Sequence, residues 1–388
     1  MPDIGRAPSS YSTHSKGHTS VALVCPRTSN RRGPTPAGPH EDGQHRENHC
    51  RMRVYGGGFL LNEFNQKRAP QVDGLRMRST LIKHASLQAA LQPWVQMECF
   101  QLSRGKSLGR LDSIDLDSKK VVRETQNAGV QKLGATPANL CTVSYSSFDP
   151  ALRFADHDAG TADTIFFMPE KTDFDVYVPA GAQTTYVSLD QDEFLRQARI
   201  LNPSVWDTLQ GGVTVLRSGQ KALLKDTVET CFMVAGGTAG SCPAFDMSGL
   251  RRLLHQAILH IATTTQAAAI EVPHAARVRA RRICRQAHAF AEERWSLHDP
   301  PTIVELCTAA GVSERTLQYA FRTHFGLSPM TYLRLLRLNR VRDILVDASP
   351  GTTSVTAIAM DHGFLHLGRF ARDYKRLFGQ SPSATLGR

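Results

Sequence analysis

The stretch from Asp299 to Pro329, DPPTIVELCTAAGVSERTLQYAFRTHFGLSP, predicts two short helices joined by a tight turn. Thr302 and Glu305 have the spacing of a capping box, in which each side chain bonds a backbone N–H at the helix start. Gly311 suits the left-handed residue that ends this helix, and Ser313 is placed to cap the next one. Helices joined by so short a turn cross steeply, which leaves one face of the second helix open.

The second of these helices has an apolar face and a polar face. Leu317, Phe321, His324 and Phe325 recur at helical spacing and are predicted to face the core. The opposite face carries Arg315, Gln318, Tyr319 and Arg322. These long side chains have the hydrogen-bonding groups that contact base edges and phosphates in a major groove. For this helix taken alone, an ordinary solvated face is the alternative interpretation.

The whole pattern occurs a second time, which favours the groove-binding interpretation. Leu306 and Gly311 recur 52 residues later as Ile358 and Gly363. The later positions recur at 53 residues: Leu317, Phe321, Phe325, Gly326, Ser328 and Pro329 become Phe370, Tyr374, Phe378, Gly379, Ser381 and Pro382. Repetition of the apolar spacing together with one Gly-x-Ser-Pro ending indicates a tandem helix-turn-helix domain.

The segment between the two copies, MTYLRLLRLNRVRDILV (330–346), is predicted to form one helix. At about 1.5 Å per residue it spans about 25 Å. A connector of that length holds two recognition helices near the roughly 34 Å that separates successive major grooves on one DNA face. One monomer is therefore expected to occupy two half-sites.

Residues from about Val278 to Leu386 resemble the AraC/XylS family of bacterial transcription regulators. The segments 311–338 (GVSERTLQYAFRTHFGLSPMTYLRLLRL) and 363–382 (GFLHLGRFARDYKRLFGQSP) carry the resemblance. It implies double-stranded DNA as partner and helix-turn-helix motifs at about 302–326 and 354–379. It also implies a variable effector-binding or dimerisation domain in front, a small-molecule effector, and RNA polymerase as partner if the protein is an activator.

The resemblance also implies which side chains contact DNA. Family members use the positions two, five and six past the helix cap, which are Arg315, Gln318 and Tyr319 in the first copy and Gly368, Ala371 and Arg372 in the second. The copies are unequal, because glycine and alanine offer no side-chain hydrogen bonds and His366 replaces the usual small cap. We therefore expect the first helix to contact most of the bases. Arg322 is expected to support it, and Arg372, with backbone anchoring from Arg369, Lys375 and Arg376, to act in the second.

The charge distribution agrees with a polyanionic partner. The chain of 388 residues has 46 Lys and Arg against 35 Asp and Glu, a formal charge of +11. Residues 277–388 contribute +8, whereas residues 52–276 are neutral. A basic domain behind a neutral one favours nucleic acid as partner, with a merely solubilising surplus as the alternative.

The part in front predicts a β-rich regulatory domain, an antiparallel sandwich or a cupin-like barrel, so that the fold class is α+β. Short apolar or alternating runs at 142–148, 163–169, 174–181, 184–189 and 213–216 predict strands, and residues 190–209 predict two short helices. Aromatic side chains on these strands, such as Phe166, Phe174 and Trp206, are interpreted as core, with a cavity lining as alternative. No effector-binding residue is predicted.

An apolar stripe from Leu250 to Ile261 predicts an amphipathic helix that needs a partner surface. Packing on its own domain is favoured, and an intersubunit pair that would form a homodimer is the alternative. The predicted boundaries are a disordered extension (1–51), the β-rich domain (52–246), a helix and linker (247–276) and the DNA-binding domain (277–388). Because Met52 opens the first well-patterned segment, translation is hypothesised to start there, which mass spectrometry of the native N-terminus tests.

Motifs for other functions are absent from the sequence. No nucleophile elbow, phosphate loop, zinc-ligand spacing or membrane span occurs, and the eight cysteines are scattered. We therefore expect a cytoplasmic protein that is not an enzyme and has no metal or cofactor. An enzyme fused to the same DNA-binding domain, such as an alkyl-transfer repair protein, and an effector-independent architectural DNA binder remain the alternatives. Asp156, His157 and Asp158 come nearest to a metal site but are interpreted as a polar loop.

Overall fold

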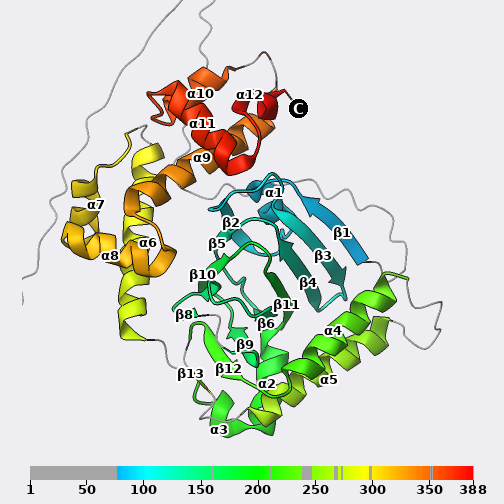
Figure 1. Ribbon diagram of the computed structural model, residues 1–388. Helices are drawn as coiled ribbons and strands as arrows, with labels where there is room; N and C mark the ends of the chain where they lie inside the picture. The colour runs from blue at the N-terminus through cyan, green and yellow to red at the C-terminus, as the bar shows by residue number, and fades with distance from the viewer. Residues whose placement is uncertain are drawn as a thin grey trace, which may run out of the picture. The chain divides into compact units, whose positions relative to one another are not determined.

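The computed structural model describes residues 77–158, 161–209, 211–237, 247–265, 270–271, 274–296, 299–349, 351 and 353–387. The predictions for residues 1–51, disorder and a start at Met52, lie outside these residues. In the described chain, strands dominate up to residue 217 and helices dominate from residue 275 onward (Figure 1). This order confirms the predicted α+β class.

Two antiparallel sheets form the first half of the described chain. The larger has eight described strands in the order β1-β3-β4-β11-β6-β9-β12-β13. These are β1 (Met77–Ile82), β3 (Gly109–Asp115), β4 (Lys120–Gln126), β6 (Leu140–Ser146), β9 (Thr164–Met168), β11 (Gln183–Asp190), β12 (Thr214–Arg217) and β13 (Ile270–Glu271). The smaller, in the order β2-β5-β10-β7-β8, contains β2 (Gln96–Gln101), β5 (Val130–Ala135), β7 (Arg153–Phe154), β8 (His157–Asp158) and β10 (Asp173–Val178).

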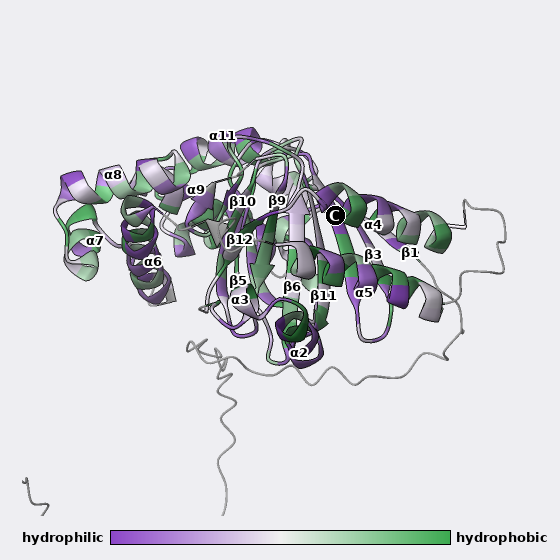
Figure 2. Ribbon diagram, turned by 90° about the horizontal axis from the view of Figure 1, so that it is seen from below, coloured by the Kyte–Doolittle hydropathy of each residue, from purple (hydrophilic) through white to green (hydrophobic). Residues whose placement is uncertain are grey.

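Helices cover the outer face of the larger sheet. They are α2 (Gln191–Leu201), α3 (Pro203–Trp206), α4 (Lys221–Ala235) and α5 (Met247–Thr264), whereas α1 (Ala85–Ala90) packs beside β2. Figure 2 shows both hydrophilic and hydrophobic residues along α5, as expected for an amphipathic helix. The predicted stripe is buried in one core with strand residues: Leu250, Leu254 and Ile258 pack in the cluster that contains Val143. The favoured interpretation, packing on its own domain, is confirmed, and the stripe is not a free surface.

The second half of the described chain is helical and has the predicted tandem order. It contains α6 (Ala275–Ser296), α7 (Ile303–Ala310), α8 (Glu314–Phe325), α9 (Pro329–Asp347), α10 (Val355–Asp361), α11 (Leu367–Phe378) and α12 (Pro382–Leu386). Two apolar cores hold these helices together, and the side chain of Leu335 on α9 packs against both. The connecting helix is therefore the shared spine of the two helix-turn-helix units.

Candidate nucleic-acid interface and internal cavity

The first helix-turn-helix unit has the local geometry that its sequence predicts. Thr302 and Glu305 form both bonds of the capping box, and Gly311 ends α7 at a φ of 63°. Ser313 Oγ accepts from Thr316 N at 3.3 Å, and only three residues separate the end of α7 from the start of α8. This short turn fixes the crossing of the two helices and keeps one face of α8 outward.

The two faces of α8 separate as predicted. Leu317 and Phe321 are fully buried, and His324 is 5% exposed. On the other side Arg315, Tyr319 and Arg322 are exposed and Gln318 is half-buried. The four side chains proposed for DNA contact from the first unit therefore share one accessible face.

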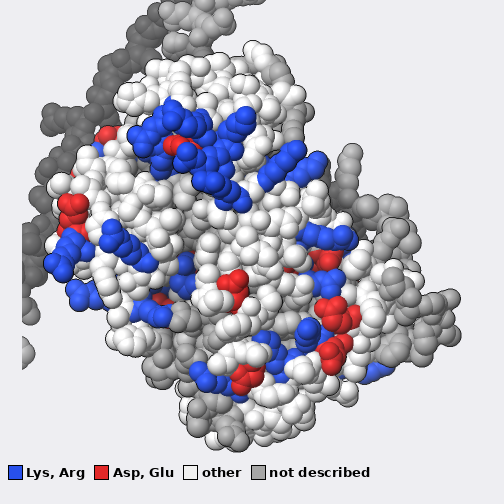
Figure 3. All heavy atoms as spheres, viewed as in Figure 1, with Lys and Arg blue, Asp and Glu red and all other residues white. Residues whose placement is uncertain are grey.

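The second unit presents a basic face of the same kind. Phe370, Tyr374 and Phe378 are buried, whereas Arg369, Arg372, Lys375 and Arg376 are exposed along α11. Figure 3 shows Lys and Arg gathered over the region where α11 lies. His366, at the start of α11, makes no side-chain capping bond. The predicted departure from a small capping residue thus leaves the start of this helix without a side-chain cap.

The spacing of the two recognition helices depends on α9. This helix has 19 residues, which at about 1.5 Å per residue gives a length of about 28 Å. Leu333 and Leu336 lie in the core of the first unit, and Leu338 and Val341 lie in the core of the second. Because each end of α9 belongs to one unit, neither unit can rotate freely about it.

A feature that the sequence did not reveal is the docking of the smaller sheet on the first helix-turn-helix unit. His324 Nε2–H donates to Asp175 Oδ2 at 2.6 Å, and Arg153 Nη2 donates to Asp175 Oδ1 at 3.0 Å. Arg153 also donates to the backbone oxygen of His324. On β5, the strand next to β10, Gln131 Oε1 accepts from Tyr332 Oη at 2.9 Å. The contacts of this group that cross from the sheet to the helices join residues 149 to 201 positions apart in the chain.

The electrostatics of this contact favour an ionised carboxylate and a neutral imidazole. Asp175 is 2% exposed, and the positive charge of Arg153 together with the His324 hydrogen bond holds the pKa of Asp175 well below its usual range against the effect of burial. Burial and the nearby Arg153 lower the pKa of His324. The Arg153 and Asp175 charges therefore balance each other inside the contact.

The smaller sheet also contacts α9 and the second unit. Asn339 Nδ2 donates to Gln101 O, and Gln101 N donates to Asn339 Oδ1, both at 2.9 Å. The Gln101 side chain in turn donates from Nε2 to Leu377 O on α11 at 3.0 Å. A separate contact comes from outside the smaller sheet, where Arg342 Nη2 donates to O of Lys83, just after β1, at 3.0 Å. The sheet thus touches both units and the helix between them.

Acidification is expected to lower the free energy of unfolding through His288. His288, on α6, lies against Tyr332 and near Glu98, Glu292 and Arg340, and burial lowers its pKa to about 4. Between pH 6.5 and 4 the unfolded chain binds more protons at this site, so the stability present above pH 6.5 decreases as the pH falls. The full loss at this site is about 3 kcal/mol. Urea unfolding as a function of pH tests this, and His288→Gln should flatten the slope, whereas an unchanged slope would contradict the assignment.

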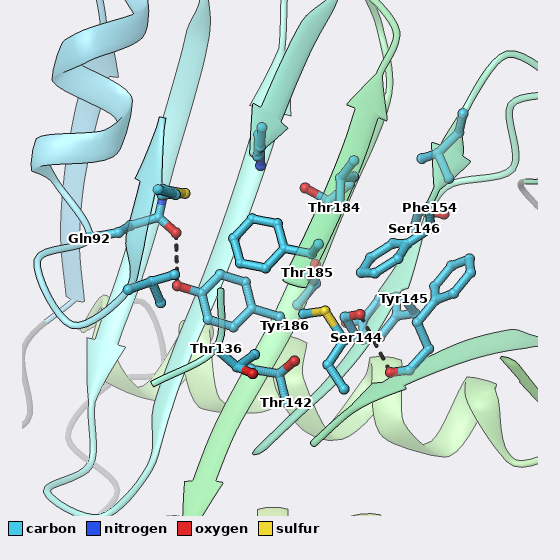
Figure 4. Close-up of a pocket in the computed structure, with 18 residues that line it drawn as sticks. Gln92, Thr136, Thr142, Ser144, Tyr145, Ser146, Phe154, Thr184, Thr185 and Tyr186 are labelled. Carbon is cyan, nitrogen blue, oxygen red and sulfur yellow. Dashed lines mark hydrogen bonds between the residues drawn. The ribbon is translucent and has the colours of Figure 1, made fainter. Parts of the chain in front are cut away.

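The β-rich part contains a cavity of about 80 Å³ between the two sheets (Figure 4). Its apolar wall includes Leu152, Phe154, Phe166, Met168, Phe174 and Val176. Thr142 and Ser144 on β6 lie beside Met168 and Phe166 of the neighbouring strand β9, and Tyr186 on β11, Lys132 and Gln92 also line the cavity. Phe166 and Phe174 belong to a buried core cluster and also line the cavity, and Trp206 lies in the core.

Metal-binding and thiol chemistry can be examined in the described residues. They hold no group of three or more His, Cys, Asp or Glu side chains suited to a metal ion. Asp156, from the nearest candidate motif, instead accepts from Arg281 Nε at 2.8 Å. The described cysteines are free, and burial raises the pKa of Cys141 to about 12, which disfavours a reactive thiolate. Among the same residues, no helix is long and apolar enough to cross a membrane.

A family model matches the carboxyl-terminal part of the chain. Residues 306–388 match a family model described as a helix-turn-helix domain. The probable thc operon regulatory protein of Rhodococcus erythropolis is 44% identical over 87 residues, which are 22% of this chain and 26% of that protein. The XylDLEGF operon transcriptional activator of Pseudomonas putida is 44% identical over 85 residues, with the same coverage. The chain thus matches about a quarter of the length of these relatives.

A solved structure also matches part of the chain. The crystal structure of a probable AraC family transcriptional regulator from Rhodopseudomonas palustris CGA009 is 41% identical. The match covers 27% of this chain and 94% of that one, with a TM-score of 0.25.

Proposed function

Since the carboxyl-terminal tandem helix-turn-helix domain of this chain belongs to the AraC/XylS family of transcription regulators, we propose that the protein is a sequence-specific, effector-responsive regulator that inserts α8 and α11 into successive major grooves. The observation that carries the proposal is the pair of exposed faces on α8 and α11, held by one connecting helix. In the described residues no ion pair occupies Arg315, Arg322, Arg369, Arg372, Lys375 or Arg376. These side chains are available for phosphates and bases.

Effector response is supported by the smaller sheet, because its two faces have different contacts. Along β10, Phe174 and Val176 line the cavity, whereas Asp175 between them bonds His324 of the first unit. Along β5, Lys132 lines the cavity and its neighbour Gln131 bonds Tyr332. Successive residues of a strand point to opposite faces. A ligand that moves this sheet therefore shifts the populations of DNA-competent and DNA-incompetent arrangements.

We also propose a cellular location and a protein partner, following the AraC/XylS family. The protein acts in the cytoplasm without catalysing a reaction, and as an activator it contacts RNA polymerase. A homodimer through the Leu250 to Ile261 stripe is not part of the proposal, because that stripe packs in its own core. An effector-independent DNA binder would have the same recognition helices but would not respond to cavity substitutions.

Substitutions in the recognition helices test the division between base and phosphate contacts. An operator is first selected from a pool of random duplexes. Gln318→Ala should cost about 1 to 3 kcal/mol and relax the base preference at one position, because it removes a contact to a base edge. Lys375→Ala should weaken binding to all sequences alike and reduce the salt slope by about one, because it removes a phosphate contact.

The matched control is Lys225→Ala, which removes an exposed cation from α4. It should leave both affinity and salt slope unchanged. Equal losses from Gln318→Ala and Lys375→Ala on every sequence would refute the division of roles, and loss of the salt slope with Lys225→Ala would place the DNA elsewhere.

A further inference from the structure

We propose that the internal cavity binds an uncharged, mainly apolar small molecule that carries one hydrogen-bonding group. This inference rests on the effector response proposed above and specifies its ligand. Four properties of the described residues support it: the apolar wall, the mutual neutralisation of the Lys132 and Glu124 charges, the hydroxyl groups that lack a hydrogen-bond partner, and the size of the space.

The apolar wall comes from three elements that meet between the sheets. Phe154 on β7 and Phe166 on β9 stack with ring centroids 4.3 Å apart and planes 12° apart. Phe174 and Val176 on β10 and Met168 on β9 continue this surface. Aromatic and aliphatic side chains of this kind make favourable contacts with the apolar body of a ligand.

The charged groups at the cavity already neutralise each other. Lys132 lines the cavity and pairs with Glu124, which is 1% exposed. The Glu124 carboxylate also accepts from Gln92 Nε2 at 2.6 Å and from Thr184 Oγ1 at 3.3 Å. Burial lowers the pKa of Lys132 to about 8, and the pair stays neutral whichever partner holds the proton. A carboxylate or amine ligand would add an uncompensated charge to a buried site, which is strongly unfavourable.

The hydroxyls of Thr142, Tyr145 and Thr185 line the cavity without a hydrogen-bond partner among the described residues, and those of Tyr145 and Thr185 are near enough to interact with each other. Thr142 is 4% exposed, and its hydroxyl has no hydrogen-bond partner among the described residues. Ser144 makes only a long bond, 3.5 Å, to Phe166 O. Tyr186, by contrast, donates to Gln92 Oε1 at 2.8 Å and accepts from Trp94 Nε1 at 3.1 Å. A ligand hydroxyl or carbonyl is therefore expected to face Thr142.

The volume restricts the ligand to a small molecule. The cavity measures about 80 Å³, whereas an engineered cavity of about 150 Å³ binds benzene. Short-chain compounds fit the space as it stands. A single ring requires the flexible side chains of Met97 and Met168, which line the cavity, to change rotamer.

Two probe molecules that have nearly the same shape but differ in charge test the proposal. Isobutyramide and isobutyrate are titrated into the full chain, without DNA, and dissociation constants are measured by ligand-observed NMR. Isobutyramide should bind at least about tenfold more tightly, because isobutyrate adds a buried negative charge. In Glu124→Gln the Lys132 charge loses its partner, so the preference should move at least about tenfold toward isobutyrate.

Two further variants give the controls. Glu229→Gln alters an acidic side chain of α4 that pairs with Arg123 outside the cavity lining, and it should leave the ratio of the two affinities unchanged. Thr142→Val, of nearly equal shape, should weaken isobutyramide binding several-fold and leave binding of isobutane, which has no polar group, intact.

The outcomes separate this inference from the proposed function. Equal or tighter binding of isobutyrate by the unsubstituted chain, or binding of neither probe, overturns the ligand class. If isobutyramide binds with the predicted preference and leaves operator affinity unchanged, the ligand class stands and the effector response fails.

Discussion

Asp175→Ala should destabilise the folded protein by about 3 to 5 kcal/mol, because it leaves the Arg153 guanidinium without its buried partner. Arg153 and Asp175 are 3.0 Å apart, and their side chains are 12% and 3% exposed. The same change removes the acceptor of the His324 hydrogen bond. We expect a lower urea midpoint and the loss of any effect of cavity ligands on operator affinity.

The neighbouring carboxylate provides a matched control. Asp173 lies on the same strand two residues earlier and pairs with Arg285 at 2.8 Å, but the two side chains are 58% and 51% exposed. Since exposed pairs contribute little, Asp173→Ala should cost less than about 1 kcal/mol and leave the ligand response intact. Equal urea midpoints for the two variants would show that the Asp175 contact does not hold the sheet on the first unit.

The second large effect is expected from Phe370→Ala, in the core of the second unit. Phe370 is 1% exposed and lies 4.9 Å from Phe364 and 5.7 Å from Tyr374, measured between ring centroids. Removal of a buried phenyl ring costs about 3 to 5 kcal/mol. Because α11 then loses its support, the affinity for a complete operator should fall by about a hundredfold or more, measured by fluorescence anisotropy.

A truncated operator distinguishes loss of the second unit from general misfolding. On DNA that contains only the first half-site, Phe370→Ala and the unsubstituted protein should bind equally. Leu365→Ala, a nearby apolar side chain that is 78% exposed, should behave like the unsubstituted protein on both DNAs. Equal affinity of Phe370→Ala and the unsubstituted chain for the complete operator would exclude a role for the second unit.

The helical half could be predicted from sequence because its signals are local. The capping box of Thr302 and Glu305, the left-handed Gly311 and the apolar spacing of α8 each depend on residues within a few positions. Repetition of this pattern then identified the second unit. The exposed faces of α8 and α11 follow directly from the helical period.

The β-rich half was predicted less completely. Strands with strong apolar runs, such as β6, β9, β10 and β11, lie where expected, but α4 lies inside the predicted β-rich domain at a place where no helix is predicted. The α4 core residues Leu224, Val228, Cys231 and Phe232 do have helical spacing, which was the available signal. The fold class could therefore be predicted from the sequence, whereas the helices that cover the larger sheet were recognised only in the structure.

The contact between Asp175 and His324 could not be predicted from neighbouring residues in the sequence. A strand that alternates Phe174, Asp175 and Val176 is the usual pattern for one buried and one solvated face. In this protein both faces are buried, and Asp175 meets His324 from a segment 149 residues away. The helical pattern did predict that His324 is buried, but no sequence feature names its partner.

Hydroxyl-radical footprinting of the selected operator tests the central claim most directly. Two protected blocks on one face of the duplex, with centres about 10 base pairs apart, are predicted, because the two recognition helices enter successive major grooves. Phe370→Ala should remove one block and retain the other. A single protected block with the unsubstituted protein, or two blocks on opposite faces of the duplex, would contradict the account.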